Sequence, residues 1–318
     1  MTTSFEQLLE LLSDEAQPFP TAKLSELSDL DAEHVKQLRE VWNQFPVDRR
    51  RMLIHEIGIQ AELRFELTFE QVNRLALSDS DSDVRAIAIQ NLWECESPDL
   101  VPHFLETLNQ DPTSLVRSAA AKALGLFVWL GEIDQLSEDL LHQIEEELIR
   151  STREDQDEEV RRHSLESLGF SSRKEVPPLI DQAYRSGDEA YMRSALFAMG
   201  RSASDQWGPY VIVELVNPSP IIRKEAARAA GELELREAIE PLIELLDDVN
   251  NQVRDSAIWA LGQIGGEEAA DALLLLLDSA IDDELTTTLE EALDHLAFVN
   301  DTRDFLLIDF DDNEELDF

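Results

Sequence analysis

The sequence contains little of what several large protein classes require. Its single cysteine, Cys95, excludes an internal disulfide framework and any zinc site built from clustered cysteines. Only 11 glycines and 12 prolines occur in 318 residues, too few for a fibrous or low-complexity chain. The longest uninterrupted apolar run, residues 272–277, is far too short to span a bilayer, so we expect no membrane segment.

Basic residues are also scarce. There are 26 Lys and Arg against 68 Asp and Glu, a formal charge of -42. Such a surface repels nucleic acid and anionic lipid, because binding to either needs basic side chains that neutralise phosphates. We therefore expect a protein or peptide partner, with no nucleic acid and no membrane; the alternative is that the charge only maintains solubility. Residues 1–6 lack the basic start and apolar run of a signal peptide, which predicts a cytoplasmic protein.

What the sequence does contain is a repeat of about 31 residues. In most copies an Arg follows an aliphatic residue, a small residue comes three positions later, an apolar residue seven later and often Gly eight later. The Arg-equivalent positions are 31–35 residues apart, except for one interval of 44 residues, and they are 50, 85, 117, 161, 192, 223, 254 and 286. This regularity predicts a stack of similar units.

Each unit has the pattern of two helices. Amphipathic segments such as 100–108 and 140–149 precede the motif, and short turns rich in Asp, Asn, Ser and Pro separate the helices. No stretch shows the sustained two-residue alternation of a strand. Small residues and Gly at fixed positions would let the second helices approach closely. The predicted fold is all-α, a right-handed α-solenoid of about eight helix pairs.

The repeated phrase resembles a known family. Val116-Arg117-Ser118-Ala119-Ala120-Ala121-Lys122-Ala123-Leu124-Gly125 is similar to the HEAT-like repeats of bacterial α-solenoids, including the phycobilin-lyase type. The resemblance covers residues 30–298 and implies a solenoid whose concave face, lined by the second helices, is the usual binding surface. It is specific for the fold and says little about activity.

The remaining segments suggest the limits of the domains. We expect an N-terminal helical cap over 1–29, the solenoid over 30–298 and an acidic C-terminal tail over 299–318, flexible beyond about Asp309. The long interval places an insertion near 127–137, and its start, 127–131, is unusually apolar. This insertion either extends the second helix into the core or projects an aromatic side chain towards a partner.

The concave face should carry the residues one and five positions after each Arg, which are neighbours on one helical face. In the middle of the chain these are basic and aromatic, and the candidate partner-binding residues are Arg162, Arg193, Phe197, Lys224, Arg228 and Trp259. They predict a groove for an acidic or aromatic peptide; the alternative is a solvated face whose charges pair with neighbouring Glu and Asp. The repeated Arg itself is expected to bond an Asp or a helix-end carbonyl of the next repeat.

The acidic end supplies a second candidate binding element. After Arg254 the only basic residue is Arg303, and apolar residues alternate with acids towards the end of the chain. Phe305, Phe310 and Phe318 are the candidate contact residues of this tail. The alternatives are a polar cap folded onto the last repeat and a tail that only aids solubility.

Signatures of catalysis are scarce. The six histidines show no HExxH spacing, and no phosphate-binding loop or serine-nucleophile motif occurs. His55-Glu56 is the only His-Glu pair, whereas the HEAT-like di-iron hydroxylases need several. We expect no metal and no cofactor, and a non-enzymatic scaffold that binds a protein through its concave face or its acidic end. The alternative is an accessory to cofactor attachment, as implied by the phycobilin-lyase resemblance.

Overall fold

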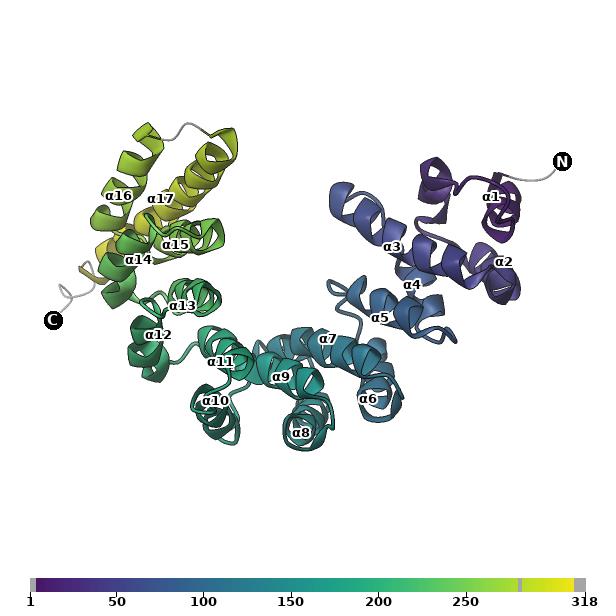
Figure 1. Ribbon diagram of the computed structural model, residues 1–318, viewed down its shortest axis with the longest axis horizontal. Coiled ribbons are helices and arrows are strands. Elements are labelled where there is room, and N and C mark those ends of the chain that lie inside the picture. Colours follow the sequence, from purple (N-terminus) through teal and green to yellow (C-terminus); the bar gives the residue numbers. More distant parts are fainter. Residues whose placement is uncertain (1–3, 280–281, 312–318) are drawn as a thin grey trace, which may run out of the picture. The chain divides into compact units, whose positions relative to one another are not determined.

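The computed structural model describes residues 4–279 and 282–311, and every regular element in these ranges is helical (Figure 1). Short 3-10 segments, among them η1 (Thr21–Leu27) and η4 (Leu168–Phe170), lie between some helices. The α-helices are α1 (Ser4–Ser13), α2 (Ala32–Val41), α3 (Val47–Leu63), α4 (Glu70–Ala76), α5 (Ser82–Gln90), α6 (Val101–Gln110), α7 (Ser114–Glu132), α8 (Glu138–Glu154), α9 (Glu158–Ser167), α10 (Val176–Tyr184), α11 (Glu189–Arg201), α12 (Gly208–Glu214), α13 (Pro220–Glu232), α14 (Ile239–Leu245), α15 (Asn251–Ile264), α16 (Glu267–Ser279) and α17 (Asp283–Asp311). From α2/α3 to α16/α17 they form successive pairs.

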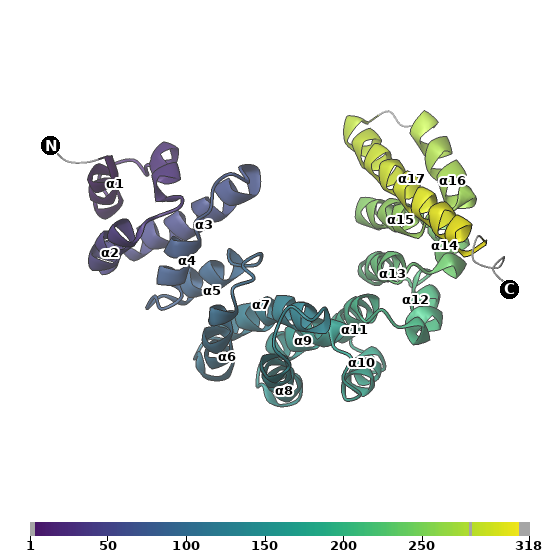
Figure 2. The ribbon, with the colours of Figure 1, turned by 180° about the vertical axis from the view of Figure 1, so that it is seen from behind.

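The chain divides into two compact units, unit 1 (Met1–Ser167) and unit 2 (Leu168–Phe318). In unit 1 the second helices of successive pairs pack in sequence, α3 on α5, α5 on α7 and α7 on α9. In unit 2 the order is α11, α13, α15 and α17, and Figure 2 shows these helices from behind. This stacking of helix pairs confirms the predicted all-α solenoid.

Close approach between second helices explains the glycine of the motif. A Cβ atom on Gly231 of α13 would lie 2.9 Å from the Cα atom of Ala260 on α15. A Cβ atom on Gly262 of α15 would lie 2.9 Å from the backbone oxygen of Ala292 on α17. Both distances are too short for a real side-chain carbon, so Gly is needed for this spacing.

The repeated Arg binds two partners at once. One nitrogen donates to the backbone carbonyl six residues earlier, at 2.6–3.0 Å, in Arg85, Arg117, Arg161, Arg223 and Arg254. In three of these the guanidinium also forms a two-pronged ion pair with an Asp of the next repeat, at 2.7–3.0 Å, in the pairs Arg85–Asp111, Arg117–Asp155 and Arg223–Asp248. The predicted structural role of the repeated Arg is confirmed.

Each Asp of this series joins consecutive repeats. The Asp111 carboxylate accepts hydrogen bonds from Arg85 and from the backbone N–H of Thr113, while its backbone carbonyl accepts one from Arg117. One repeat has Met192 at the Arg position, and the next loop then has Asn217 at the place that Asp111, Asp155 and Asp248 take in their repeats. Asn217 keeps the backbone role, since its carbonyl accepts a hydrogen bond from Arg223 at 2.8 Å.

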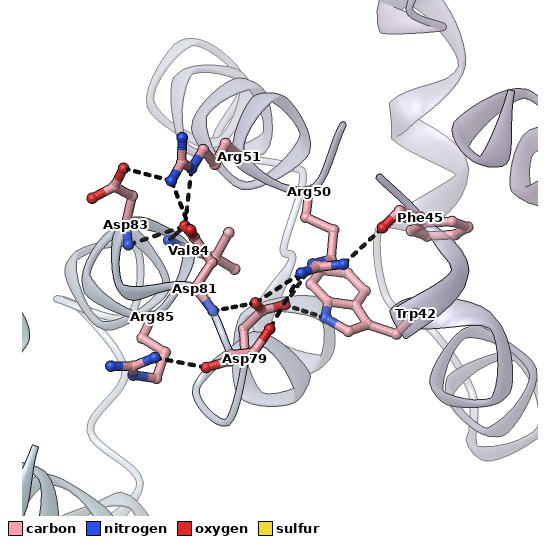
Figure 3. A network of polar contacts seen from close by, with 10 residues as sticks. Trp42, Phe45, Arg50, Arg51, Asp79, Asp81, Asp83, Val84 and Arg85 are labelled. Carbon is pink, nitrogen blue, oxygen red and sulfur yellow. Dashed lines mark hydrogen bonds and ion pairs between the residues drawn. The ribbon is translucent and has the colours of Figure 1, made fainter. Parts of the chain in front are cut away.

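At the N-terminal end of unit 1 the same arrangement is buried (Figure 3). Asp79 accepts a hydrogen bond from the indole nitrogen of Trp42 at 2.6 Å, and its carboxylate lies 2.8 Å from Nε of Arg50. Arg50 also donates to the carbonyl of Phe45 at 2.7 Å, and Arg85 donates to the carbonyl of Asp79 at 2.8 Å. Such a buried network of ion pairs and hydrogen bonds fixes the loop between α4 and α5.

The apolar insertion extends a second helix. α7 continues to Glu132, and the side chains of Phe127, Val128 and Leu130 are buried, while Trp129 is partly exposed. By length and composition alone α7 could cross a membrane, but 61% of the relevant window is buried inside the fold. That burial is typical of a core helix.

The two ends of the chain extend the helical pattern. In the predicted N-terminal cap, α1 and η1 bury their apolar side chains, including Leu8, Leu12 and Leu24. At the other end α17 runs to Asp311, so the predicted tail boundary at residues 298–299 lies inside a helix. Residues 312–318, including Phe318, lie outside the described ranges. The domain limits therefore stay a prediction.

Candidate partner-binding face

Three adjacent second helices of unit 2 carry five of the six residues that the sequence predicted for a concave binding face. α11 packs against α13, and α13 packs against α15. We call the surface of these helices that bears the candidate residues the α11–α15 face; it is defined by Arg193, Phe197, Lys224, Arg228 and Trp259. The sixth candidate, Arg162, lies on α9 in unit 1 and is not part of this face.

Phe197 is the centre of a stack of rings and guanidinium groups. The guanidinium carbon of Arg228 lies 4.1 Å from the centroid of the Phe197 ring, and that of Arg201 lies at the same distance. Arg201 also lies 4.7 Å from the ring centroid of Phe170 in η4. Cation–π contacts of this kind stabilise by about 0.5–1 kcal/mol each. The stack therefore holds two cations and two rings in fixed positions.

The charge of Arg228 is largely balanced within the face. Its Nε donates to Glu225 at 2.5 Å, and Nη1 is bound to Glu232. Glu225 and Glu232 lie on α13 within one turn of Arg228, so these ion pairs are local. For this residue the alternative weighed from the sequence, internal pairing with neighbouring acids, is the one observed.

Only one oxygen of the Glu232 carboxylate has a partner. Its second carboxylate oxygen, Oε2, is buried without a hydrogen-bond partner. Burial raises the pKa of Glu232, and the nearby charges of Arg228 and Arg201 act in the opposite direction. A Cβ atom on Gly200 would lie 2.5 Å from Oε2, so this glycine makes room for the carboxylate.

Two candidate residues remain available at the surface. Lys224 is exposed, and its ammonium nitrogen lies 3.3 Å from the side-chain oxygen of Gln252. Trp259 is 39% exposed and its ring lies against α13, where a Cβ atom on Gly231 would be 2.7 Å from it. An exposed ammonium and an exposed indole on adjacent helices could contact a carboxylate and an apolar side chain of a partner.

The sequence reasoning missed part of this face. It did not include Arg201, Phe170, Glu225 or Glu232, because it considered only two positions in each repeat. The signal for Arg201 was present, since it lies four residues after Phe197 on the same helical face. Phe170 lies in η4, well before Phe197 in the sequence, so only the packed structure reveals its contact with Arg201.

The described residues offer little for catalysis. Among residues 4–279 and 282–311 no three His, Cys, Asp or Glu side chains are grouped so that they could hold a metal ion. Burial raises the pKa of the Cys95 thiol, which disfavours the reactive thiolate at neutral pH. A hollow of about 560 Å³ in unit 1 is lined mainly by polar groups, including Ser4, Glu26 and His34.

Comparison with known proteins identifies the class. The family model for HEAT repeats matches residues 72–146 and 209–294, which together make up half of the chain. The chain belongs to the HEAT repeat family. This confirms the resemblance seen in the repeated Val-Arg-x-x-Ala-x-x-x-Leu-Gly phrase.

One relative supports the resemblance to HEAT-like repeats of the phycobilin-lyase type. Phycocyanobilin lyase subunit alpha of Synechococcus elongatus is 46% identical over 57 residues, which is 18% of this chain. The match spans 21% of that relative's length, so the two proteins share only a segment.

Two solved structures are similar to this chain over most of its length. The complex of CpcE and CpcF of phycocyanin lyase from Nostoc sp. PCC7120 is 22% identical, with coverage of 73% of this chain and 95% of that one and a TM-score of 0.46. Human deoxyhypusine hydroxylase is 17% identical, with coverage of 92% and 96% and a TM-score of 0.38. At these identities the likeness concerns the fold alone.

Proposed function

We propose that this protein is a non-enzymatic interaction scaffold whose α11–α15 face binds a partner segment with acidic and aromatic or apolar side chains. HEAT repeats suit this role, because their stacked second helices present an extended surface rather than a closed pocket. The observation that carries the proposal is the exposed pair Lys224 and Trp259 beside the stack around Phe197.

The chemistry of the face favours such a partner. Lys224 offers an exposed cation on a chain with a formal charge of -42, so it could pair with a partner's carboxylate. Trp259 offers apolar area at low conformational cost, which is typical of interface residues. Arg228 is ion-paired with Glu225 and Glu232. It would therefore contribute to partner binding through the fixed position of its guanidinium group rather than through net charge.

Fluorescence anisotropy of a labelled peptide tests the proposal. The probe is a synthetic peptide of Glu-Phe-Glu-Ser repeats, and its control has Lys in place of Glu. We expect the variant Lys224→Ala/Trp259→Ala to lose about tenfold or more in affinity, with an unchanged circular dichroism spectrum. The matched control, Lys122→Ala/Trp93→Ala, removes an exposed Lys and an exposed Trp from unit 1 and should bind as the wild type does. If both variants bound the peptide with equal affinity, the binding site would not lie on the α11–α15 face.

The acidic end stays the second proposed element of the scaffold. Phe305 and Phe310 lie in the last turns of α17 by their backbone positions, and Phe318 lies beyond it. Deletion of residues 301–318 separates the two elements. Loss of binding to a basic partner protein after deletion, with the Glu-Phe-Glu-Ser peptide still bound, would assign that partner to the acidic end.

A second candidate function is an accessory role in bilin attachment. It is favoured by the 46% identical segment shared with phycocyanobilin lyase subunit alpha. Mixing the protein with phycocyanobilin tests this directly, because a bound and straightened tetrapyrrole changes its absorption spectrum. A saturable spectral shift would support the accessory role over a purely peptide-binding one. The cytoplasmic location and the exclusion of nucleic acid and membrane stay predictions from composition.

A further inference from the structure

Unit 1 presents exposed apolar side chains at the ends of three consecutive second helices. Leu63 at the end of α3 is 77% exposed, and Phe65 just beyond it is 98% exposed. Trp93, three residues after the end of α5, is 62% exposed, and Trp129 near the end of α7 is partly exposed. Large exposed apolar groups at one end of adjacent helices mark interaction surfaces more often than scattered single residues do.

These side chains lie near the carboxyl ends of successive second helices, at different positions of the repeat. Counted from the Arg of each repeat, Leu63, Trp93 and Trp129 are 13, 8 and 12 residues further on. At helical spacing Trp129 lies on the same face of α7 as the residues one and five positions after the Arg, whereas Trp93 lies beyond the end of α5.

Contacts within unit 1 place these second helices side by side. The side-chain amide of Asn91 at the end of α5 donates to the carbonyl of Ile54 on α3 at 2.8 Å. Trp93 follows two residues later, and α5 in turn packs against α7. We call the surface formed by Leu63, Phe65, Trp93, Trp129 and the partly exposed Ile133 the aromatic edge.

The fold itself does not account for Trp93. At the same repeat position Gly58 and Gly125 pack so closely on the next second helix that a Cβ atom would lie 2.5 Å and 2.9 Å from Asn91 and Ser167. Trp93 replaces that glycine and projects into solvent instead. A solvent-exposed indole adds no core packing, and Trp is the residue most enriched at the energetic centre of interfaces.

The charges beside the aromatic edge favour a basic partner. Within the described part of the chain, the exposed acids Glu62, Glu94, Glu96 and Asp134 make no ion pair. The nearby cation Arg64 is bound to Glu66 at 3.0 Å, whereas Lys122 is exposed on α7 about two turns before Trp129. Carboxylates thus outnumber available cations around an apolar strip, which repels acidic segments and attracts basic ones.

We propose that the aromatic edge docks an amphipathic, basic helix of a partner protein. Its apolar side chains would cover Leu63, Phe65, Trp93 and Trp129, and its Lys or Arg side chains would face Glu62, Glu94 and Glu96. This is the helix-in-groove mode, in which apolar anchors at helical spacing supply affinity and the flanking charges set orientation.

A designed peptide tests this docking. The probe is a labelled helix of Leu and Lys, about 18 residues long, with all leucines on one face, and its control is a scrambled peptide of the same composition. We expect the intact protein to bind the amphipathic peptide about tenfold more tightly than the scrambled one at physiological salt. Equal affinity for the two peptides would overturn the proposal, because charge alone would then explain the binding. No binding of either peptide would also overturn it, because the edge would then not dock a basic helix.

Matched variants locate the contact. Leu63→Ser/Phe65→Ser/Trp93→Ser removes the most exposed part of the aromatic edge, and Val216→Ser/Val249→Ser/Leu275→Ser removes equally exposed apolar groups from unit 2. We expect about tenfold weaker binding in the first variant and unchanged binding in the second. Unchanged binding in the first variant would refute the assignment. The proposed function is tested separately, since the edge variant should still bind the Glu-Phe-Glu-Ser peptide.

Discussion

The ion pairs between the repeated Arg and an Asp of the next repeat join neighbouring repeats, so removing one of these Asp carboxylates should destabilise two repeats at once. In Asp111→Ala the guanidinium of Arg85 loses both ion-pair contacts, at 2.9 Å and 3.0 Å, and the backbone N–H of Thr113 loses its acceptor. The two side chains are only 10% and 13% exposed, so the unpaired charge stays mostly out of water. Breaking a buried pair costs about 3–5 kcal/mol and losing a hydrogen bond in the turn about 1 kcal/mol. Because both groups keep some access to water, we expect a loss of about 3 kcal/mol.

The chain supplies its own control for this prediction. The repeat with Met192 followed by Asn217 lacks both charges and still keeps the backbone bond from Arg223. Arg85→Met/Asp111→Asn copies that combination and leaves no charge unpaired. We expect it to cost less than Asp111→Ala, with a coupling energy of about 2 kcal/mol in a double-mutant cycle.

Urea denaturation followed by circular dichroism, with hydrogen exchange of the α5–α7 amides, measures both effects. Hydrogen exchange is needed because repeat proteins can unfold in parts rather than in one transition. A cost below about 0.5 kcal/mol for Asp111→Ala, or no coupling in the cycle, would show that the ion pair does not hold the repeats together.

Three further outcomes follow from the packing and the pKa shifts. Gly262→Ala should cost about 1–2 kcal/mol in a urea melt, because its Cβ atom would lie 2.9 Å from a backbone oxygen, whereas Gly208→Ala, with its nearest neighbour a side chain at 3.3 Å, should be nearly neutral. The hydrogen bond from Arg223 holds the pKa of Asp248 below its usual 3.8, so the pair stabilises at neutral pH and the benefit disappears as the pH falls through the lowered pKa. Asp248→Asn should therefore be less stable than the wild type at pH 7, and the difference should shrink in acid; a constant difference would contradict this assignment. Burial raises the pKa of Glu232 above 4.5, so its neutral form stabilises at low pH and that benefit is lost as the pH rises. Glu232→Gln should remove this decline, and identical pH profiles of stability would show that the carboxylate is not the cause.

The repeat register could be predicted from sequence because its determinants are local. The spacing of Arg117, Ala120 and Gly125 recurs in the next repeats, and each residue type has one packing reason. The partner of the Arg could be predicted as a class, an Asp or a carbonyl, and the structure shows that both are used.

The candidate site was less predictable because its properties depend on contacts between helices. The sequence suggested a basic strip from Arg162 to Arg228, but Arg162 lies in unit 1 and Arg228 is bound by two glutamates. The stack of Arg201 with Phe170 and Phe197 joins consecutive repeats through a position nine residues after the Arg-equivalent one, which the sequence reasoning did not consider. The exposure of Trp93 depends on the early end of α5 and had no signal beyond the replaced glycine.

The most direct test of the scaffold account is to see where a bound peptide touches the protein. A Glu-Phe-Glu-Ser peptide with a benzophenone in place of one Phe can be cross-linked by light and mapped by mass spectrometry. The account predicts cross-links on α11, α13 and α15, close to Trp259 and Phe197, and their loss in Lys224→Ala/Trp259→Ala. Cross-links concentrated on other helices, and unaffected by that variant, would contradict it.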